Sequence, residues 1–180
     1  MFRTLHLLYV LFFFVSCSNQ NQTINEEIRS VYGEKVEIPV TEMIRMNENK
    51  SNFNHCKYHF LVYQDEESCS DCALSHYSEW EEVLSDFLQI KEPVDLTIIW
   101  EGNHLDEDIR EGLCSTDYSR CIYWDSTYIF KKRNPKLSCH SYMHTLLLDS
   151  LNQIILVGNP ILNPRIRQLA LKRLENRNDK

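Results

Sequence analysis

The feature that most constrains the fold is a pair of cysteines, Cys69 and Cys72, between an apolar run and an amphipathic stretch. The run before them, residues 58–63 (YHFLVY), is rich in β-forming residues and predicts a buried strand. The stretch after them repeats apolar residues at helical spacing: Leu74, Tyr77, Trp80, Val83, Leu84, Phe87 and Leu88. Pro93 ends this helix, and residues 94–100 (VDLTIIW) predict a second buried strand. Strand, CxxC, helix and strand together form a βαβ unit.

The rest of the chain predicts further strands and helices around this unit. Residues 35–40 (KVEIPV) indicate a short edge strand, because Pro39 cannot donate to a neighbour. Residues 45–55 are rich in Asn and indicate a loop. Residues 121–125 predict a third strand, and residues 145–149 and 154–158 predict an antiparallel hairpin.

Three further helices complete the prediction. Asn103 begins one that extends to Gly112, and Ser126 begins another that ends before Pro135. Asn163 caps the last, with Pro164 in its first turn. We therefore expect an α/β fold, with a mixed central sheet and helices on its faces.

The N-terminus predicts export and lipid anchoring. Residues 1–16 have a positive start at Arg3 and a short apolar stretch that ends in a small residue, as signal peptides do. The last residues before Cys17 (FVS) resemble a bacterial lipobox, so we expect Cys17 to carry the lipid. An ordinary secretory signal with an incidental cysteine is the alternative. If Cys17 carries the lipid, residues 17–34 form a lipidated tether that is polar and flexible over residues 18–30, and residues 35–180 form the domain.

Charge and composition narrow the classes of ligand. The formal net charge is −7, and it becomes −8 once the leader with Arg3 is removed. This argues against a nucleic-acid partner, whose binding needs a basic surface. The sequence contains no phosphate-binding Gly-rich loop, Ser-His-Asp order or paired-carboxylate motif, and we expect no cofactor. His55, Cys56, His59, Cys69 and Cys72 have metal-binding side chains, but their spacing matches no zinc pattern.

The CxxC spacing itself favours thiol chemistry. Two intervening residues let both sulfurs meet at a helix N-terminus, where the helix dipole favours a thiolate on Cys69, while Cys72 lies one turn further in. Four nearby carboxylates oppose that charge: Asp65, Glu66, Glu67 and Asp71. The sequence does not decide this balance, so the redox potential stays open.

With these elements in place, the chain resembles the thioredoxin-like superfamily over about residues 57–175. The resemblance is strongest to envelope thiol–disulfide oxidoreductases and related lipoproteins, and three segments carry it: 68–72 (SCSDC), 144–149 (HTLLLD) and 157–160 (VGNP). It implies that Cys69 attacks and Cys72 resolves, with envelope proteins that bear thiols or disulfides as partners. Two positions depart from the superfamily pattern: no aromatic residue precedes Cys69, and Met143 stands in place of a cis-proline.

Other interpretations of these residues remain open. The domain is alternatively a non-catalytic binding module, with Cys69–Cys72 as a structural disulfide. Cys114 and Cys121 are close enough in sequence for a local structural disulfide, which we favour over two free thiols. Cys56 and Cys139 could pair across the domain, but these four cysteines allow three pairings, and the sequence does not choose among them. For His144 we expect a place against the sheet, or a local hydrogen bond, rather than a catalytic role.

Overall fold

The computed structural model describes residues 22–46, 56–67, 76–114 and 121–178. The chain divides into two units, Met1–Tyr32 and Gly33–Lys180. In the first unit residues 22–31 are helical, inside the segment for which the sequence predicts a flexible tether. Ile24, Ile28 and Val31 follow helical spacing there, which accounts for the difference. Among the described helices, none has the length and hydropathy that a membrane span requires.

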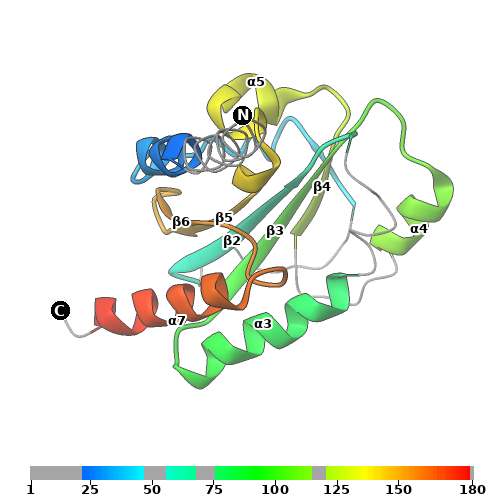
Figure 1. Cartoon of the computed structure of the whole chain (residues 1–180). Coiled ribbons are helices and arrows are strands. Elements are labelled where there is room, and N and C mark those ends of the chain that lie inside the picture. The colour runs from blue at the N-terminus through cyan, green and yellow to red at the C-terminus, as the bar shows by residue number, and fades with distance from the viewer. Residues whose placement is uncertain (1–21, 47–55, 68–75, 115–120, 179–180) are drawn as a thin grey trace, which may run out of the picture. The chain divides into compact units, whose positions relative to one another are not determined.

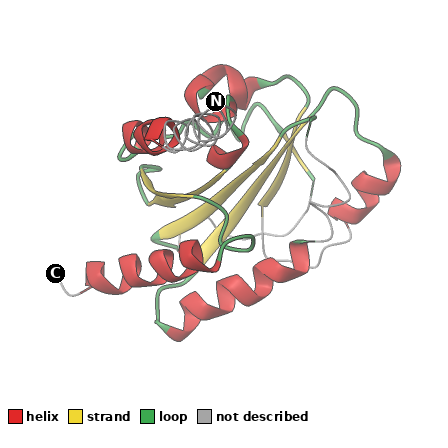
Figure 2. Ribbon diagram, in the orientation of Figure 1, coloured by secondary structure: helices red, strands yellow, loops and turns green. Residues whose placement is uncertain are grey.

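The second unit is built on a mixed sheet of six strands (Figure 2). Its order is β1-β4-β3-β2-β5-β6. The central strands β2, β3 and β4 are parallel, whereas β5 is antiparallel to β2, and β6 to β5. Their bounds are Ile44–Arg45 (β1), Tyr58–Gln64 (β2), Val94–Glu101 (β3), Cys121–Asp125 (β4), Thr145–Asp149 (β5) and Ile154–Val157 (β6). The predicted mixed sheet and its hairpin are confirmed. Arg45, the first residue of the loop predicted over residues 45–55, belongs to β1 instead.

Helices flank this sheet (Figure 1). The α3 and α7 helices lie side by side, and Arg167 of α7 reaches Asp86 (2.6 Å) and Glu82 (3.0 Å) of α3. The predicted cap of α7 is confirmed, since Asn163 accepts a hydrogen bond from the Arg165 backbone. The bounds are Tyr77–Gln89 (α3), Glu107–Cys114 (α4), Ile129–Arg133 (α5), Pro135–Ser138 (α6), Pro164–Asn178 (α7) and the 3₁₀ turn Ser141–Met143 (η1).

The core under α3 is aromatic. Phe87 is fully buried and meets Phe60 of β2 edge-on, with ring centroids 5.7 Å apart, and Trp80 lies 5.2 Å from Phe60. This is the contact that the helical spacing predicts between α3 and β2. One residue of the predicted apolar pattern, Leu88 near the end of α3, faces solvent instead.

The strand predicted over residues 35–40 is wrong. Only Lys35 forms a bridge, with Gln153. Further along, the side chain of Asn134 accepts from the Glu37 amide (3.0 Å) and donates to the Glu37 carbonyl (2.8 Å). These backbone groups are thus satisfied by a distant side chain rather than by a neighbouring strand.

Two helices begin later than the sequence predicts. The helix expected from Asn103 begins at Glu107. The helix expected from Ser126 begins at Ile129, because the buried carboxylate of Asp125 accepts from the amides of Ile129 (3.0 Å) and Phe130 (2.8 Å). An Asp at a strand end therefore caps α5, as short polar side chains do at helix N-termini.

Candidate functional site

The predicted reactive cysteines, Cys69 and Cys72, lie in residues 68–75, outside the described residues, as does the predicted lipid site Cys17. The structure does fix both flanks of the CxxC segment. It follows the carboxyl end of β2 at Gln64 and precedes α3, which begins at Tyr77. In open α/β sheets ligands bind beyond the carboxyl ends of the parallel strands, so this edge is the place to search for a site.

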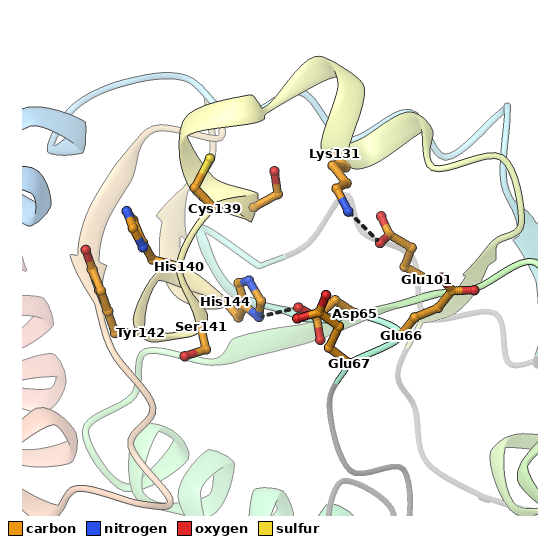
Figure 3. A pocket seen from close by; sticks show the side chains of 11 residues that line it. Asp65, Glu66, Glu67, Glu101, Lys131, Cys139, His140, Ser141, Tyr142 and His144 are labelled. Carbon is orange, nitrogen blue, oxygen red and sulfur yellow. Dashed lines mark hydrogen bonds and ion pairs between the residues drawn. The ribbon is translucent and has the colours of Figure 1, made fainter.

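A polar pocket of about 480 Å³ opens at this edge (Figure 3). Its lining comes from four segments: the residues after β2, the end of β3, α5, and the stretch from the end of α6 to the start of β5. The lining residues are Asp65, Glu66, Glu67, Glu101, Lys131, Ser138, Cys139, His140, Ser141, Tyr142 and His144. The sequence did not lead us to expect Glu101, Lys131, Cys139 or His140 in one place.

Glu101 forms one wall of the pocket with two partners. Its side chain is almost fully buried, accepts a hydrogen bond from the Tyr63 hydroxyl, and lies 3.5 Å from the Lys131 ammonium. Burial raises the pKa of Glu101, while the hydrogen bond from Tyr63 and the charge of Lys131 oppose that rise. Burial and the bond to Glu101 raise the pKa of Tyr63, so its hydroxyl keeps its proton as the donor.

His144 lies in the opposite part of the pocket from Glu101, between Asp65 and Cys139 (Figure 3). Its side chain is 9% exposed and packs edge-on against Tyr63, with ring centroids 4.9 Å apart. Nδ1 lies 4.0 Å from a carboxylate oxygen of Asp65, and the buried Nε2 has no hydrogen-bond partner among the described residues. Burial lowers the pKa of His144, and this favours a neutral ring, while the charge of Asp65 and the backbone of Ser138 oppose the fall. The expected place against the sheet is confirmed.

Glu66 ties the segment after β2 to neighbouring loops. Its carboxylate accepts from the Tyr128 hydroxyl (2.7 Å) and the Asn103 amide (3.1 Å). These bonds lower the pKa of Glu66, so it carries a negative charge at neutral pH. The preceding strand end is thereby held against the loops that follow β3 and β4.

Met143, which the sequence resemblance aligns with the cis-proline of the superfamily, is buried at the end of η1. Its amide donates to the His140 carbonyl (2.9 Å). A proline has no N–H and cannot make this bond. The stretch before β5 is therefore held by a backbone bond that the superfamily residue would lack.

The remaining cysteines do not pair as the sequence allowed. Cys56 and Cys139 are free thiols, so the disulfide between them is not formed. Cys121 is a buried thiol in β4 that accepts from Arg45 (3.6 Å), so the favoured disulfide with Cys114 is absent too. Cys139 is exposed in the pocket, with its sulfur 2.9 Å from the Pro135 carbonyl. Within the described ranges, no three His, Cys, Asp or Glu side chains gather as metal ligands.

Solved structures identify the arrangement of the sheet. A Chlorobium tepidum protein, described as a candidate thiol:disulfide interchange protein DsbE, aligns over 78% of this chain and 96% of its own. The TM-score is 0.50 and the sequence identity 9%. This chain has a thioredoxin-like fold. The predicted fold is confirmed, and within it the CxxC segment lies between strand β2 and helix α3 in the sequence.

Two other solved thioredoxin-like proteins show weaker similarity. One is a protein in the oxidised form, with a TM-score of 0.43 and 14% identity over 82% of this chain and 93% of that chain. The other, from Bacteroides caccae, has a TM-score of 0.45 and 13% identity over 65% of this chain. This chain spans 40% of the Bacteroides protein. No family model and no curated protein matches the sequence.

Proposed function

We propose that this thioredoxin-like protein exchanges thiols and disulfides through Cys69 and Cys72. The supporting observation is that a CxxC segment joins β2 to α3 in a thioredoxin-like sheet. Two cysteines so spaced, before a helix, form the arrangement in which one sulfur attacks and the other resolves. The description of the Chlorobium protein as a candidate thiol:disulfide interchange protein agrees with this assignment.

The exchange proceeds in two displacements. The Cys69 thiolate attacks one sulfur of a partner disulfide, and the other partner sulfur leaves as a thiolate that takes up a proton. Cys72, as a thiolate, then attacks the sulfur of Cys69 and releases the second partner thiol. The partner gains two electrons and two protons, while Cys69 and Cys72 become a disulfide. The reverse sequence oxidises a partner dithiol by the same steps.

We propose that the protein works in the cell envelope, anchored through Cys17. The signal-like leader and the small residue before Cys17 support export and lipidation. An exported domain meets proteins whose disulfides persist, so envelope proteins bearing thiols or disulfides are its partners. Lipid on Cys17 would hold the domain at a membrane surface.

Trapping of a mixed disulfide tests the exchange. Cys72→Ser in the full chain should accumulate partners on Cys69, because the resolving thiol is missing. The matched variant Cys69→Ser should trap none. Both are read on non-reducing gels, with bands that disappear on reduction. If neither variant captures a partner and both lower the melting temperature equally, exchange through this pair is refuted.

A non-catalytic binding module is the second candidate, and Met143 favours it. The Met143 amide donates a hydrogen bond to the His140 carbonyl in the stretch that precedes β5. In the superfamily this stretch carries a proline beside the reactive pair, and a proline could not donate this bond. In this case Cys69–Cys72 is a structural disulfide, with a reduction potential below about −300 mV. Equilibration with glutathione or dithiothreitol buffers measures the potential, and a value near those of exchange proteins, about −120 to −270 mV, excludes the structural disulfide.

A further inference from the structure

The last helix, α7, is basic in a chain that is otherwise acidic. Over Pro164–Asn178 it has five Lys or Arg residues and one carboxylate, that of Glu175. The formal net charge of the chain is −7, which is +4 in this helix and −11 in the rest. A negatively charged surface therefore attracts the protein at α7 and repels most of the remainder.

One side of α7 presents two of these cations together with an apolar side chain. Arg165, Leu169 and Lys172 recur at steps of four and three residues, so they lie on one face of the helix, which we call the α7 face. All three are exposed, Leu169 to 51%, and Leu162 in the turn before the helix is 68% exposed. Neither cation of the α7 face has an ion pair among the described residues, whereas Arg167 is paired with two carboxylates of α3.

The α7 face lies beside the place where the chain enters the domain. Gly33 begins the second unit, and its amide donates to the Ile154 carbonyl of β6 (2.9 Å). Arg173 lies one turn beyond Leu169 on the same side of α7, and it donates to the next carbonyl of β6, that of Ile155 (2.7 Å). The edge strand β6 is thus bonded to both segments at neighbouring residues.

An anionic lipid bilayer matches this combination of side chains and position. Basic side chains beside exposed leucines are typical of helices that lie at a membrane interface, where cations bind the headgroups and apolar side chains enter the layer beneath. With residues 22–31 helical, the segment from Cys17 to Gly33 spans at most about 40 Å. A lipid on Cys17 would therefore keep the β6 edge of the domain close to a bilayer.

We propose that the α7 face docks on an anionic lipid bilayer. The contact is weak and reversible on its own, because it consists of a few side chains, and the acyl chains still supply stable anchoring. That the bilayer is the one that holds Cys17 rests on the proposed function. The affinity of the α7 face for anionic lipid does not.

Docking would also orient the reactive end of the domain. Ile154, to which Gly33 is bonded, lies across β5 from His59, at the amino end of β2. The CxxC segment follows Gln64, at the carboxyl end of β2. The tether therefore joins the sheet at the end opposite the CxxC segment, and the carboxyl end of the sheet stays open to partners.

Flotation with lipid vesicles tests the docking. The protein is the mature chain, residues 17–180, with Cys17→Ala so that no acyl chain contributes. It should bind vesicles of phosphatidylethanolamine and phosphatidylglycerol about tenfold or more tightly than vesicles of phosphatidylcholine. Salt at about 1 M should abolish the difference, because the Debye length falls to about 3 Å. Equal binding to both vesicles, or binding to neither at low salt, overturns the proposal.

Two double variants with equal loss of charge locate the contact. Arg165→Gln/Lys172→Gln should weaken binding to the anionic vesicles about tenfold or more. Arg110→Gln/Lys132→Gln changes exposed residues of α4 and α5, elements that Figure 1 shows away from α7, and should weaken binding by less than about threefold. Equal losses in the two variants would show general charge attraction and refute the site.

Exposed leucines distinguish a bilayer from other occupants of the α7 face. Leu169→Ala should weaken vesicle binding about threefold or more, because apolar contact is lost. Leu88→Ala should leave it unchanged, since Asp86 contacts Arg167 of α7 and Leu88, two residues on, points away from α7. If soluble polyglutamate binds as tightly as the vesicles and Leu169→Ala has no effect, the face recognises acidic polypeptides. If analytical ultracentrifugation shows a dimer that Leu169→Ala abolishes, the occupant is a second copy of the chain. Either result overturns the proposal.

The outcomes separate docking from the proposed function. If the chain without lipid binds anionic vesicles but Cys17 is unmodified in cells, the anchor proposal fails and the docking stands. If Cys17 carries lipid but the chain without lipid binds no vesicles, only the docking fails. The double variant Cys69→Ser/Cys72→Ser should bind vesicles like the unmodified protein, because the α7 face does not depend on the thiols.

Discussion

Phe87→Ala should remove the central contact between α3 and the sheet. Phe87 is fully buried, and its ring meets that of Phe60 at 5.7 Å. Truncation loses the transfer free energy of the ring and leaves a cavity, together about 3–5 kcal/mol. The edge-on ring pair contributes about 0.5–1.5 kcal/mol of this. For a domain of this size, the melting temperature should fall by about 6–20 °C.

The matched control is the adjacent residue of the same helix. Leu88 is 64% exposed, and Leu→Ala hardly alters helix propensity, so Leu88→Ala should change stability by less than about 0.5 kcal/mol. Urea denaturation followed by circular dichroism gives both free energies of unfolding. If the two variants are destabilised equally, or Phe87→Ala by less than about 1 kcal/mol, the packing of α3 on β2 is wrong.

Three further predictions test other parts of the molecule. Cys17→Ala should move the protein from the membrane to the soluble fraction, or leave it unprocessed, because acyl chains supply the affinity. Unmodified Cys17 in a soluble mature protein, found by mass spectrometry, would contradict this. Asp125→Ala should cost about 1–3 kcal/mol, since α5 loses its cap, whereas Ser126→Ala should cost little on urea denaturation. The raised pKa of Glu101 means that the folded state binds its proton more tightly, so stability is lost as pH rises above the ordinary value of 4.5. Glu101→Gln should therefore gain stability over the unmodified protein as pH increases from 4 to 7, and a gain that does not vary with pH would refute the assignment.

Sequence reasoning succeeded where apolar residues alone determine the element. The runs at 58–63 and 94–100 differ from the observed β2 and β3 by one residue at their ends. Their side chains are buried on both faces of the sheet, so the hydrophobic pattern is dense and local. The cap of α7 was predictable for a similar reason, because Asn163 and Pro164 act within one turn.

The elements that were predicted wrongly have hydrogen-bond partners that are distant in sequence or that belong to an unexpected element. Nothing in residues 35–40 reveals that the side chain of Asn134 satisfies Glu37. The start of α5 was missed because the capping carboxylate belongs to the last residue of a strand, Asp125. Local propensity depends on the residues of the segment itself, so it predicts neither contact.

The pocket could be predicted only in part. Asp65, Glu66 and Glu67 were visible as a charged group beside the CxxC segment, but only as an influence on the thiolate. His144 is far from Asp65 in sequence, and the two meet because β5 pairs with β2, where Thr145 lies opposite Val62. The signal that would have found this part of the pocket is the register, because it places His144 opposite Tyr63 and therefore diagonal to Asp65, two residues further along.

The central position of β2 also has a consequence for the order of assembly. Its neighbour β3 is close along the chain, whereas its other neighbour, β5, comes much later in the sequence. Closing the longer loop costs more entropy, so we expect β2 to pair with β3 before it pairs with β5. Amides of β2 should then be among the slowest to exchange with solvent, since both edges are hydrogen-bonded. The pocket has lining residues on both sides of this pairing, Asp65 after β2 and His144 before β5, so the pocket is complete only when β5 is paired with β2.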